Sequence, residues 1–231
     1  MLNLGGFVPF SASDYPGYLA CVAFVQGCNW RCSYCHNPHL QSRHPHPLAP
    51  SWPQVLEFLS ERQNLLDAVV FSGGEPTMDP ALPTAIKQAK SLGFKIGLHT
   101  TGAYTKRFAQ ILPDLDWVGF DFKAPWHTYH KIIERKQPLT HVQDSMQQLL
   151  TTDCAYEIRT TIHSSLHQPA DLLAMAEYLS TLNIGHWVLQ HFRAEGCINN
   201  TLSHLQPHQR GLLDKALLSD IRELVPQVTI R

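Results

Sequence analysis

The sequence predicts an α/β fold in which short buried strands alternate with helices around a parallel sheet. Two observations support this prediction. Short apolar segments recur along the 231 residues, each followed by a polar or glycine-containing turn and a segment with helical periodicity. About six such strand–helix units follow one another, fewer than the eight of a closed barrel. We therefore expect a partial (β/α)6 TIM-like barrel with a C-terminal helical extension, folded as a single domain.

The first predicted strand, Tyr18–Gln26, is rich in apolar and aromatic residues and ends at Gly27. A long loop follows over Cys28–Pro50, because four prolines interrupt regular structure there. Ser51 then caps a helix that has proline in its first turn and runs to about Gln63.

The same alternation continues to the end of the chain. The further predicted strands are Asp67–Phe71, Lys95–Leu98, Asp116–Phe122, Tyr156–Ile162 and Trp187–Gln190, with a short final segment at Val228–Ile230. The further predicted helices are Pro80–Leu92, Tyr104–Ile111, Leu139–Thr151, Pro169–Leu182 and about His208–Leu224. Because α/β proteins build their sites at the carboxyl ends of parallel strands, we expect the chemistry in the turns that follow the strands.

Composition excludes several classes of protein. The net charge of −1 provides no general basic surface for a nucleic-acid backbone. With 44% hydrophobic and 16% charged residues, the chain is expected to fold rather than to remain disordered. No apolar run approaches the roughly 18 to 20 residues of a membrane span, and Met1–Phe10 has no features of a cleavable signal. We expect a soluble cytoplasmic protein that binds neither nucleic acid nor membrane.

Three cysteines, Cys28, Cys32 and Cys35, form a C-x3-C-x2-C run directly after the first strand. Their thiolates can converge on one metal centre. Thiolate sulfur suits zinc or an iron–sulfur cluster, and both usually take four ligands. With only three cysteines in the run, one iron of a cluster would remain open to an external ligand.

The remaining cysteines do not supply an obvious fourth ligand. Cys21 lies within a predicted strand and Cys154 precedes another, so both are expected in the core, whereas Cys197 is unassigned. A zinc site completed by His36 or His39 is the alternative that this local pattern leaves open.

With this spacing, and with the aromatic Tyr34 before the last cysteine, the sequence resembles the radical S-adenosylmethionine (SAM) enzymes. The resemblance implies a [4Fe-4S] cluster on Cys28, Cys32 and Cys35, with the amino and carboxylate groups of SAM on the fourth iron. It also implies reductive cleavage of SAM to methionine and a 5′-deoxyadenosyl radical, with no general acid or base. The resemblance covers a core from about residue 14 to 193, followed by an extension from about 194 to 231.

Other segments add to the resemblance. Ser72–Pro76 resembles the family's G-G-E-P motif, and Asp121–Lys123 resembles its D-x-K motif. Leu98–Gly102 resembles L-D-T-N-G, except that His99 stands where the family has aspartate, so a metal contact made by that aspartate is not carried over. A further departure is that no second cysteine cluster is present, which argues against activators with a ferredoxin-like insert.

The resemblance also implies how the remaining residues bind SAM. Gly73, Gly74 and Glu75 would receive the methionine amino group, whereas Thr100, Lys123 and Arg159 would contact the ribose and carboxylate end. Tyr34 and Asn37 would line the nucleoside side.

One subgroup is matched more closely. Ser11–Gly17, Gln26–Asn29 and Cys35–Pro38 resemble the activating enzymes of glycyl-radical proteins, in particular those of anaerobic ribonucleoside-triphosphate reductases. The implied partners are a glycyl-radical protein and an electron donor such as flavodoxin or ferredoxin. The alternatives are a radical SAM enzyme acting on a small molecule, such as a deazapurine synthase, and a non-enzymatic zinc module.

Overall fold

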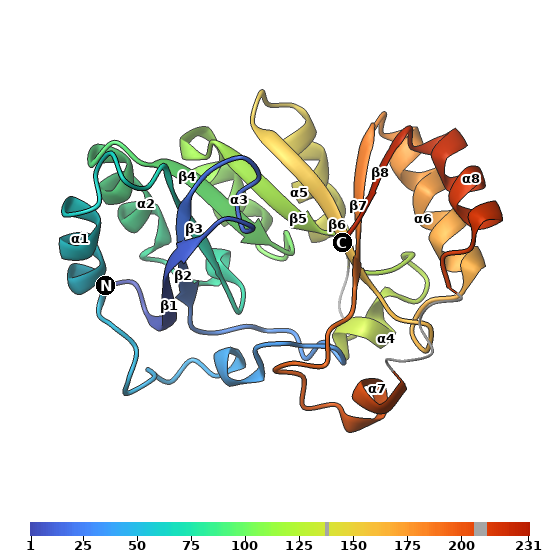
Figure 1. Ribbon diagram of the computed structural model, residues 1–231, viewed down its shortest axis with the longest axis horizontal. Helices are drawn as coiled ribbons and strands as arrows, with labels where there is room; N and C mark the ends of the chain where they lie inside the picture. Colours follow the sequence, from blue (N-terminus) through green and yellow to red (C-terminus); the bar gives the residue numbers. More distant parts are fainter. Residues whose placement is uncertain (137–138, 206–211) are drawn as a thin grey trace. The chain divides into compact units, whose positions relative to one another are not determined.

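The computed structural model describes residues 1–136, 139–205 and 212–231 and has an α/β architecture (Figure 1). The chain divides into two compact units. The first unit consists of Met1–Asn29, His39–Phe120 and Pro138–Tyr156. The second unit consists of Trp30–Pro38, Asp121–Gln137 and Glu157–Arg231.

The sheet of the first unit follows the order of the chain. Its strands are β1 (Leu4–Ser11), β2 (Ala20–Val25), β3 (Ala68–Gly73), β4 (Lys95–Thr100) and β5 (Trp117–Asp121). β1 pairs antiparallel with β2, and every following pair is parallel. The register of β2 on β3 ends with Val25 opposite Gly73, so the turns that follow these two strands begin side by side.

The helices of the first unit connect these strands. They are α1 (Trp52–Ser60), α2 (Leu82–Ser91), α3 (Thr105–Ile111) and α5 (Thr140–Leu150), with short 3-10 turns η1 (Pro38–Gln41), η2 (Pro76–Met78) and η3 (Leu112–Asp114). As predicted, Ser51 is the N-cap of α1, and its backbone N–H donates to Gln54 Oε1 at 2.8 Å. Helix α2 buries Leu82, Ala85, Ile86 and Ala89, the spacing of one helix face.

The second unit has its own strands and helices. The strands are β6 (Ala155–Ile162), β7 (His186–His191) and β8 (Gln227–Ile230), and the helices are α4 (Tyr129–Ile133), α6 (Pro169–Thr181), α7 (Asn200–Leu205) and α8 (Lys215–Leu224). β6 pairs parallel with β7, and β7 pairs parallel with β8. Helices α6 and α8 pack against each other beside these strands (Figure 1).

The predicted fold class is confirmed, with several differences in detail. Strands β2 to β7 correspond to the strands of the six predicted units. The sequence pattern missed β1, which contains two glycines and a proline, and it missed the short helices α4 and α7. The predicted helix His208–Leu224 is present from Lys215, and residues 208–211 lie outside the described residues. The C-terminal extension also contains β8, so it is not purely helical.

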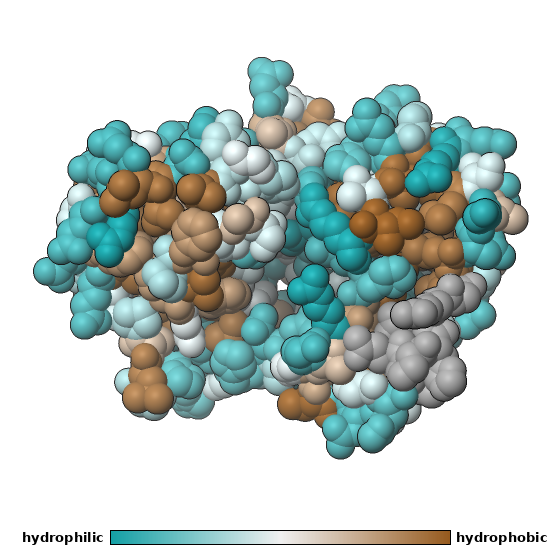
Figure 2. Space-filling model, viewed as in Figure 1, coloured by the Kyte–Doolittle hydropathy of each residue, from teal (hydrophilic) through white to brown (hydrophobic). Residues whose placement is uncertain are grey.

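Part of the apolar surface remains exposed. Phe10 on β1 is 58% exposed, and Leu65 is 65% exposed. Figure 2 shows apolar side chains gathered on the visible face of the first unit, interrupted by hydrophilic ones. Every helix in the described part of the chain is too short or too polar to cross a membrane.

The packing of α2 on the sheet can be tested by shortening one buried side chain. Ile86 is fully buried, so Ile86→Ala should lower the free energy of unfolding by about 2 to 5 kcal/mol through lost burial and a residual cavity. Urea denaturation of the protein without cofactors measures this change. Lys87→Ala, on the exposed face of the same helix, should shift stability by less than about 0.5 kcal/mol. Equal losses in both variants would contradict this orientation of α2.

Candidate active site

Two glycines, Gly73 at the end of β3 and Gly74 in the turn that follows, occupy positions where a side chain would collide with backbone atoms. Gly73 has a φ of +120°, and a Cβ there would lie 2.5 Å from the backbone N and O of Val25. A Cβ on Gly74 would lie 2.2 Å from the carbonyl oxygen of Gly27. Only glycine allows the backbone after β3 to approach the backbone after β2 so closely.

Hydrogen bonds join these two turns. The N–H of Gly74 donates to Val25 O at 3.0 Å, and the N–H of Glu75 donates to Gly27 O at 2.8 Å. Gly27 precedes Cys28 in the chain, so the turn that carries Glu75 is fixed directly to the segment that leads into the first cysteine. Two motifs that are 47 residues apart therefore lie side by side in the first unit.

The Glu75 carboxylate is fully buried and accepts five hydrogen bonds. Oε1 accepts from the N–H and Oγ1 of Thr77, at 3.1 and 2.5 Å, and from Oγ1 of Thr100 at 2.8 Å. Oε2 accepts from the N–H and Oγ1 of Thr101, at 2.8 and 2.6 Å. A carboxylate offers about four lone-pair positions, so these donors occupy its hydrogen-bonding capacity. The carboxylate thereby joins the turn after β3 to the turn after β4.

His99, the residue that departs from the L-D-T-N-G pattern, bridges two segments of the first unit. Its Nε2 donates to the carbonyl oxygen of Asp14 at 2.9 Å, and its Nδ1 lies 3.2 Å from Ser72 Oγ. Because a carbonyl only accepts, Nε2 carries the proton, and Nδ1 is left to accept from the Ser72 hydroxyl. The imidazole also contacts Trp117 edge-on. His99 thus connects the segment before β2 with β3.

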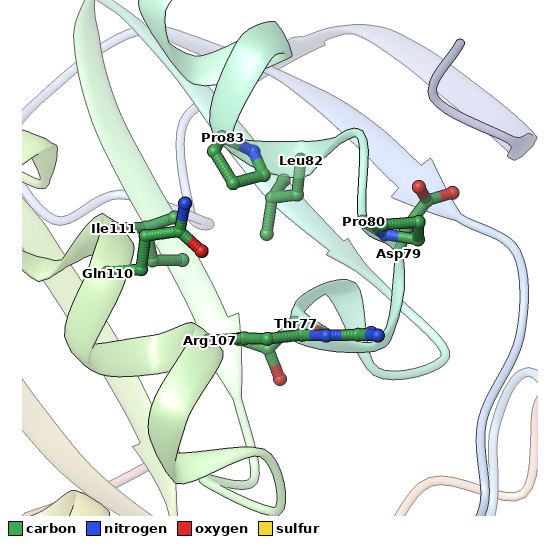
Figure 3. Close-up of a pocket in the computed structure, with 8 residues that line it drawn as sticks. All are labelled: Thr77, Asp79, Pro80, Leu82, Pro83, Arg107, Gln110 and Ile111. Atoms are coloured by element: carbon green, nitrogen blue, oxygen red, sulfur yellow. The ribbon is translucent and has the colours of Figure 1, made fainter.

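A small pocket lies beside the turn after Glu75 (Figure 3). Its lining residues are Thr77, Asp79, Pro80, Leu82, Pro83, Arg107, Gln110 and Ile111. The Arg107 guanidinium donates to the carbonyl oxygens of Thr77 and Met78. The cation in this pocket therefore supports the turn that holds Glu75.

In the second unit, two cations share one carboxylate. Arg159 donates to Asp121 Oδ1 from Nη2 at 2.9 Å and from Nε at 3.2 Å. Lys123 Nζ lies 3.2 Å from Asp121 Oδ2. A backbone hydrogen bond also joins the two segments that carry these side chains, because the N–H of Phe122 donates to Arg159 O at 2.9 Å. These three side chains therefore combine two cations with one carboxylate.

The Lys123 cation is buried among polar and aromatic groups. Its side chain is 9% exposed, and Nζ lies 5.4 Å from the centre of the Tyr34 ring. Burial disfavours the charged form, but Asp121 together with Tyr34, Cys32 and Tyr129 outweighs burial and keeps the pKa of Lys123 well above its ordinary value. Lys123 is therefore a permanent cation beside Tyr34.

The second half of the cysteine loop is ordered by its backbone. The N–H of Cys35 donates to Cys32 O at 3.0 Å, which forms a turn between the two cysteines. The N–H of Ser33 donates to Ile132 O at 3.0 Å, so the end of α4 holds this turn. Burial raises the pKa of the Cys32 thiol to about 11, and the nearby Lys123 cation partly offsets this effect.

The donor set fits an iron–sulfur cluster by its chemistry. Thiolates are the ligands that such clusters take, and the Lys123 cation near Cys32 favours the thiolate that a metal would require. Cys28 belongs to the first unit, whereas Cys32 and Cys35 belong to the second. Across residues 1–136, 139–205 and 212–231, no three His, Cys, Asp or Glu side chains are grouped closely enough to hold a metal ion.

Two buried histidines support this part of the second unit. His167 Nδ1 accepts from the N–H of His163 at 3.4 Å, and its Nε2 donates to Lys123 O at 2.9 Å. His163 Nδ1 accepts from the N–H of Ser165, and its Nε2 donates to Leu202 O at 3.1 Å. Each ring therefore needs one acceptor and one donor nitrogen, which only neutral imidazole provides. Burial accordingly lowers the pKa of both histidines.

The predicted site residues are distributed over both units. The first unit contains Cys28, Gly73, Gly74, Glu75 and Thr100. The second unit contains Cys32, Tyr34, Cys35, Asn37, Lys123 and Arg159. Each stands at or after the carboxyl end of a strand or in the cysteine loop, except Arg159, which lies within β6. The ligand contacts predicted for these residues remain predictions.

The sequence reasoning left several polar contacts unassigned. The D-x-K motif contains Asp121, but nothing local in the sequence indicates that Asp121 pairs with both Lys123 and Arg159. The fold brings the hydroxyl groups of Thr77 and Thr101 to the Glu75 carboxylate. In the sequence, the adjacent pair Thr100–Thr101 is the one local feature that points to such a cluster of donors.

Comparison with known proteins identifies related sequences. The sequence model of the Radical SAM superfamily matches residues 22–180. A protein of Methanocaldococcus jannaschii, provisionally described as a glycyl-radical enzyme activating enzyme, is 23% identical over 237 residues, covering 99% of this chain and 95% of the relative. The pyruvate formate-lyase-activating enzyme of Clostridium pasteurianum is 32% identical over 114 residues, 48% of either chain. The 7-carboxy-7-deazaguanine synthase of Methanopyrus kandleri is 33% identical over 126 residues, 46% of this chain and 50% of the relative.

Solved structures share the fold. Streptococcus suis SuiB bound to S-adenosylmethionine superposes with a TM-score of 0.61 at 11% identity, covering 89% of this chain and 48% of SuiB. A domain of a pyruvate-formate lyase-activating enzyme from Bacteroides vulgatus superposes with a TM-score of 0.54 at 16% identity, covering 71% of this chain and 99% of that domain. At these identities the likeness establishes the α/β architecture with its mostly parallel sheet.

The five hydrogen bonds to Glu75 predict a structural cost for removing its charge. In Glu75→Gln, an amide group would face donors such as the Thr101 or Thr77 N–H, leaving at least one buried donor unpaired. We expect a loss of about 1 to 3 kcal/mol in the free energy of unfolding, measured with urea on the protein without cofactors. Glu57→Gln, on the exposed face of α1, is the matched control and should be neutral. A neutral Glu75→Gln would refute this account of the carboxylate.

The buried neutral histidines predict a pH dependence of stability. The unfolded chain binds protons at histidine near pH 6.5, whereas the folded chain resists protonation at His167. The stabilisation from neutral His167 is therefore complete above about pH 6.5 and declines as the pH falls below that value. His167→Gln, which can keep both hydrogen bonds, should reduce the slope of stability between pH 7 and 5 by up to about 1.4 kcal/mol per pH unit.

Denaturation at a series of pH values measures this slope. His191→Gln, at an exposed position at the end of β7, should leave the slope at its original value. A slope that is equally steep with and without the His167 imidazole would contradict the assignment of a neutral ring.

Proposed function

The chain belongs to the radical SAM superfamily, and on this premise we propose that it generates a glycyl radical on a partner protein, an anaerobic ribonucleoside-triphosphate reductase. The observation that carries the proposal is the match to a relative named for glycyl-radical enzyme activation, which extends over 99% of this chain and 95% of the relative. A match of this extent compares the two chains almost from end to end, beyond the part common to the superfamily.

Members of this superfamily use a [4Fe-4S] cluster and S-adenosylmethionine. Cys28, Cys32 and Cys35 would hold the cluster through their thiolates. The chemistry that the bound cluster supplies is one-electron reduction of SAM, and flavodoxin or ferredoxin is the class of donor we assign to it. Residues of the chain bind and orient SAM and exclude water.

We assign the charged ends of SAM to different turns. The Gly73–Glu75 turn takes the methionine amino group through its backbone, and the buried Glu75 carboxylate holds the turn in place. Lys123 and Arg159, two cations held together beside Asp121, attract the methionine carboxylate by charge-assisted hydrogen bonds. Thr100, Tyr34 and Asn37 are assigned to the ribose and nucleoside.

The assignment of the partner rests on three sequence motifs and on a segment of the chain that is exposed to solvent. The Ser11–Gly17 motif is ordered, because Asp14 accepts from Ser11 Oγ at 2.5 Å and Tyr15 stacks on Trp117. The segment His39–Pro50 is rich in proline and carries Leu48, which is 88% exposed. We assign this segment to contact with the partner, whose backbone glycine must approach SAM.

A small-molecule radical enzyme is the second candidate. It is favoured by the 33% identity to a 7-carboxy-7-deazaguanine synthase, although that match spans only 46% of this chain. A non-enzymatic zinc module is disfavoured, because the family match extends through the cysteine loop and far beyond it.

Electron paramagnetic resonance tests the function directly. The anaerobically reconstituted protein, reduced with dithionite and mixed with SAM and an anaerobic ribonucleoside-triphosphate reductase, should produce a glycyl doublet. The doublet should vanish when the radical-site glycine of the reductase is replaced by alanine. Cys28→Ala, Cys32→Ala and Cys35→Ala should abolish the doublet and the brown cluster absorption, whereas Cys21→Ala should retain both.

Two results would redirect the assignment. Formation of 5′-deoxyadenosine without a doublet would leave radical SAM chemistry intact and remove this reductase as the partner. Turnover of a deazaguanine precursor by the same preparation would favour the second candidate. A colourless protein that binds zinc after iron reconstitution would overturn the radical chemistry as a whole.

A further inference from the structure

The chain after β7 folds against the second half of the cysteine loop. We call the segment Phe192–Leu202 the clamp. His36 Nε2 donates to the carbonyl oxygen of Arg193 at 2.8 Å, and Asn199 Nδ2 donates to the carbonyl oxygen of Ser33 at 3.2 Å. All of these residues belong to the second unit, although about 160 residues separate the two segments in the chain.

The approach of the two backbones requires a glycine. Gly196 has a φ of +81°, and a Cβ at this position would lie 2.3 Å from the carbonyl oxygen of His36. A backbone atom cannot move aside as a flexible side-chain end can, so any other residue would displace the clamp or the loop. The next residue, Cys197, lies with its Sγ 3.9 Å from the carbonyl oxygen of Ser33.

The clamp is itself anchored to the sheet. The N–H of Phe192 donates to Ile162 O, at the end of β6, at 3.1 Å. The Phe192 ring stacks on His36 at 5.5 Å between ring centres and meets His163 edge-on at 5.2 Å. His163 in turn donates to the carbonyl oxygen of Leu202, at the far end of the clamp. Both ends of the clamp are therefore attached to buried groups.

Ser33 is consequently held through both of its backbone polar groups. Its N–H donates to Ile132 O in α4, and its carbonyl oxygen accepts from Asn199 in the clamp. Ser33 lies between Cys32 and Cys35, so these two contacts fix the backbone that sets the spacing and direction of the two thiols. α4 provides one side of this support and the clamp provides the other.

We propose that the clamp is a positioning element for the cluster loop, with Asn199 and Gly196 as its positioning residues. The inference deepens the proposed function, since it concerns the loop assigned there to the cluster. It also gives the first part of the C-terminal extension a function that its sequence does not indicate. None of the clamp residues is assigned to bind the cluster itself.

Asn199 allows the positioning contact to be separated from a structural one. Its Oδ1 accepts from the N–H of Leu202 at 3.4 Å and so caps α7, whereas its Nδ2 donates to Ser33. Asn199→Asp keeps an acceptor for the cap and loses the donor, and Asn199→Ala loses both. Asn200→Ala, at the neighbouring exposed position, is the matched control.

Gly196 has a matched control elsewhere in the chain. Gly93 has a comparable φ of +91°, but a Cβ there would meet nothing within 4 Å. Gly93→Ala therefore carries the backbone strain alone, whereas Gly196→Ala carries the same strain and the collision with His36. The difference between the two variants measures the contact with the cysteine loop.

Two readouts avoid reliance on activity. The first is the rate at which the reconstituted protein loses iron to a chelator under anaerobic conditions. We expect Asn199→Asp to lose iron about 2- to 10-fold faster than the original protein, the range that one hydrogen bond predicts. Gly196→Ala should lose iron faster than Gly93→Ala, and Asn200→Ala should match the original protein.

The second readout uses the protein without iron. Iodoacetamide labelling followed by mass spectrometry should show faster modification of Cys32 and Cys35 in Asn199→Asp and Gly196→Ala, because the loop is less restrained. Labelling of Cys28, in the first unit, should not change. If the original protein takes up no iron, the proposed function fails while this labelling still tests the clamp. Unchanged labelling and iron loss in both variants would overturn the inference.

Discussion

A charged carboxylate in a protein interior is stable only when donors surround it, and Glu75 meets this requirement with five hydrogen bonds. The donors come from the turn after β3 and from the turn after β4. Because each turn supplies hydrogen bonds to the same two oxygens, neither turn can move without leaving the charge unsatisfied. The conformation of the sheet edge in the first unit depends on this one group.

The glycines beside Glu75 extend the same constraint to the cysteine loop. Gly73 and Gly74 let the turn after β3 contact the backbone after β2, and the Glu75 N–H binds the carbonyl oxygen of Gly27. Burial of the carboxylate thus restrains the residue that precedes Cys28. The G-G-E-P motif is explained as a structural unit in which the glycines permit the approach and the glutamate maintains it.

The second unit uses charge differently. Lys123 and Arg159 share Asp121, so two cations are held together beside one carboxylate at the end of β5. The neutral His167 ring restrains the backbone at Lys123, because its Nε2 donates to the carbonyl oxygen of Lys123. The first unit therefore contains a buried anion satisfied by hydrogen bonds, whereas the second pairs two cations with one carboxylate.

The sequence alone determined the alternation of strands and helices, the C-x3-C-x2-C spacing and the position of the G-G-E-P turn after a strand. These features are local, since periodicity and covalent spacing act over a few residues. The tertiary structure decided that β1 joins the sheet, that the threonines enclose the Glu75 carboxylate and that Asn199 contacts Ser33. Each of these contacts joins segments that are distant in the chain, and no local pattern encodes which distant backbone group a side chain will meet. Only the packing of the folded chain brings such donors and acceptors within hydrogen-bonding distance.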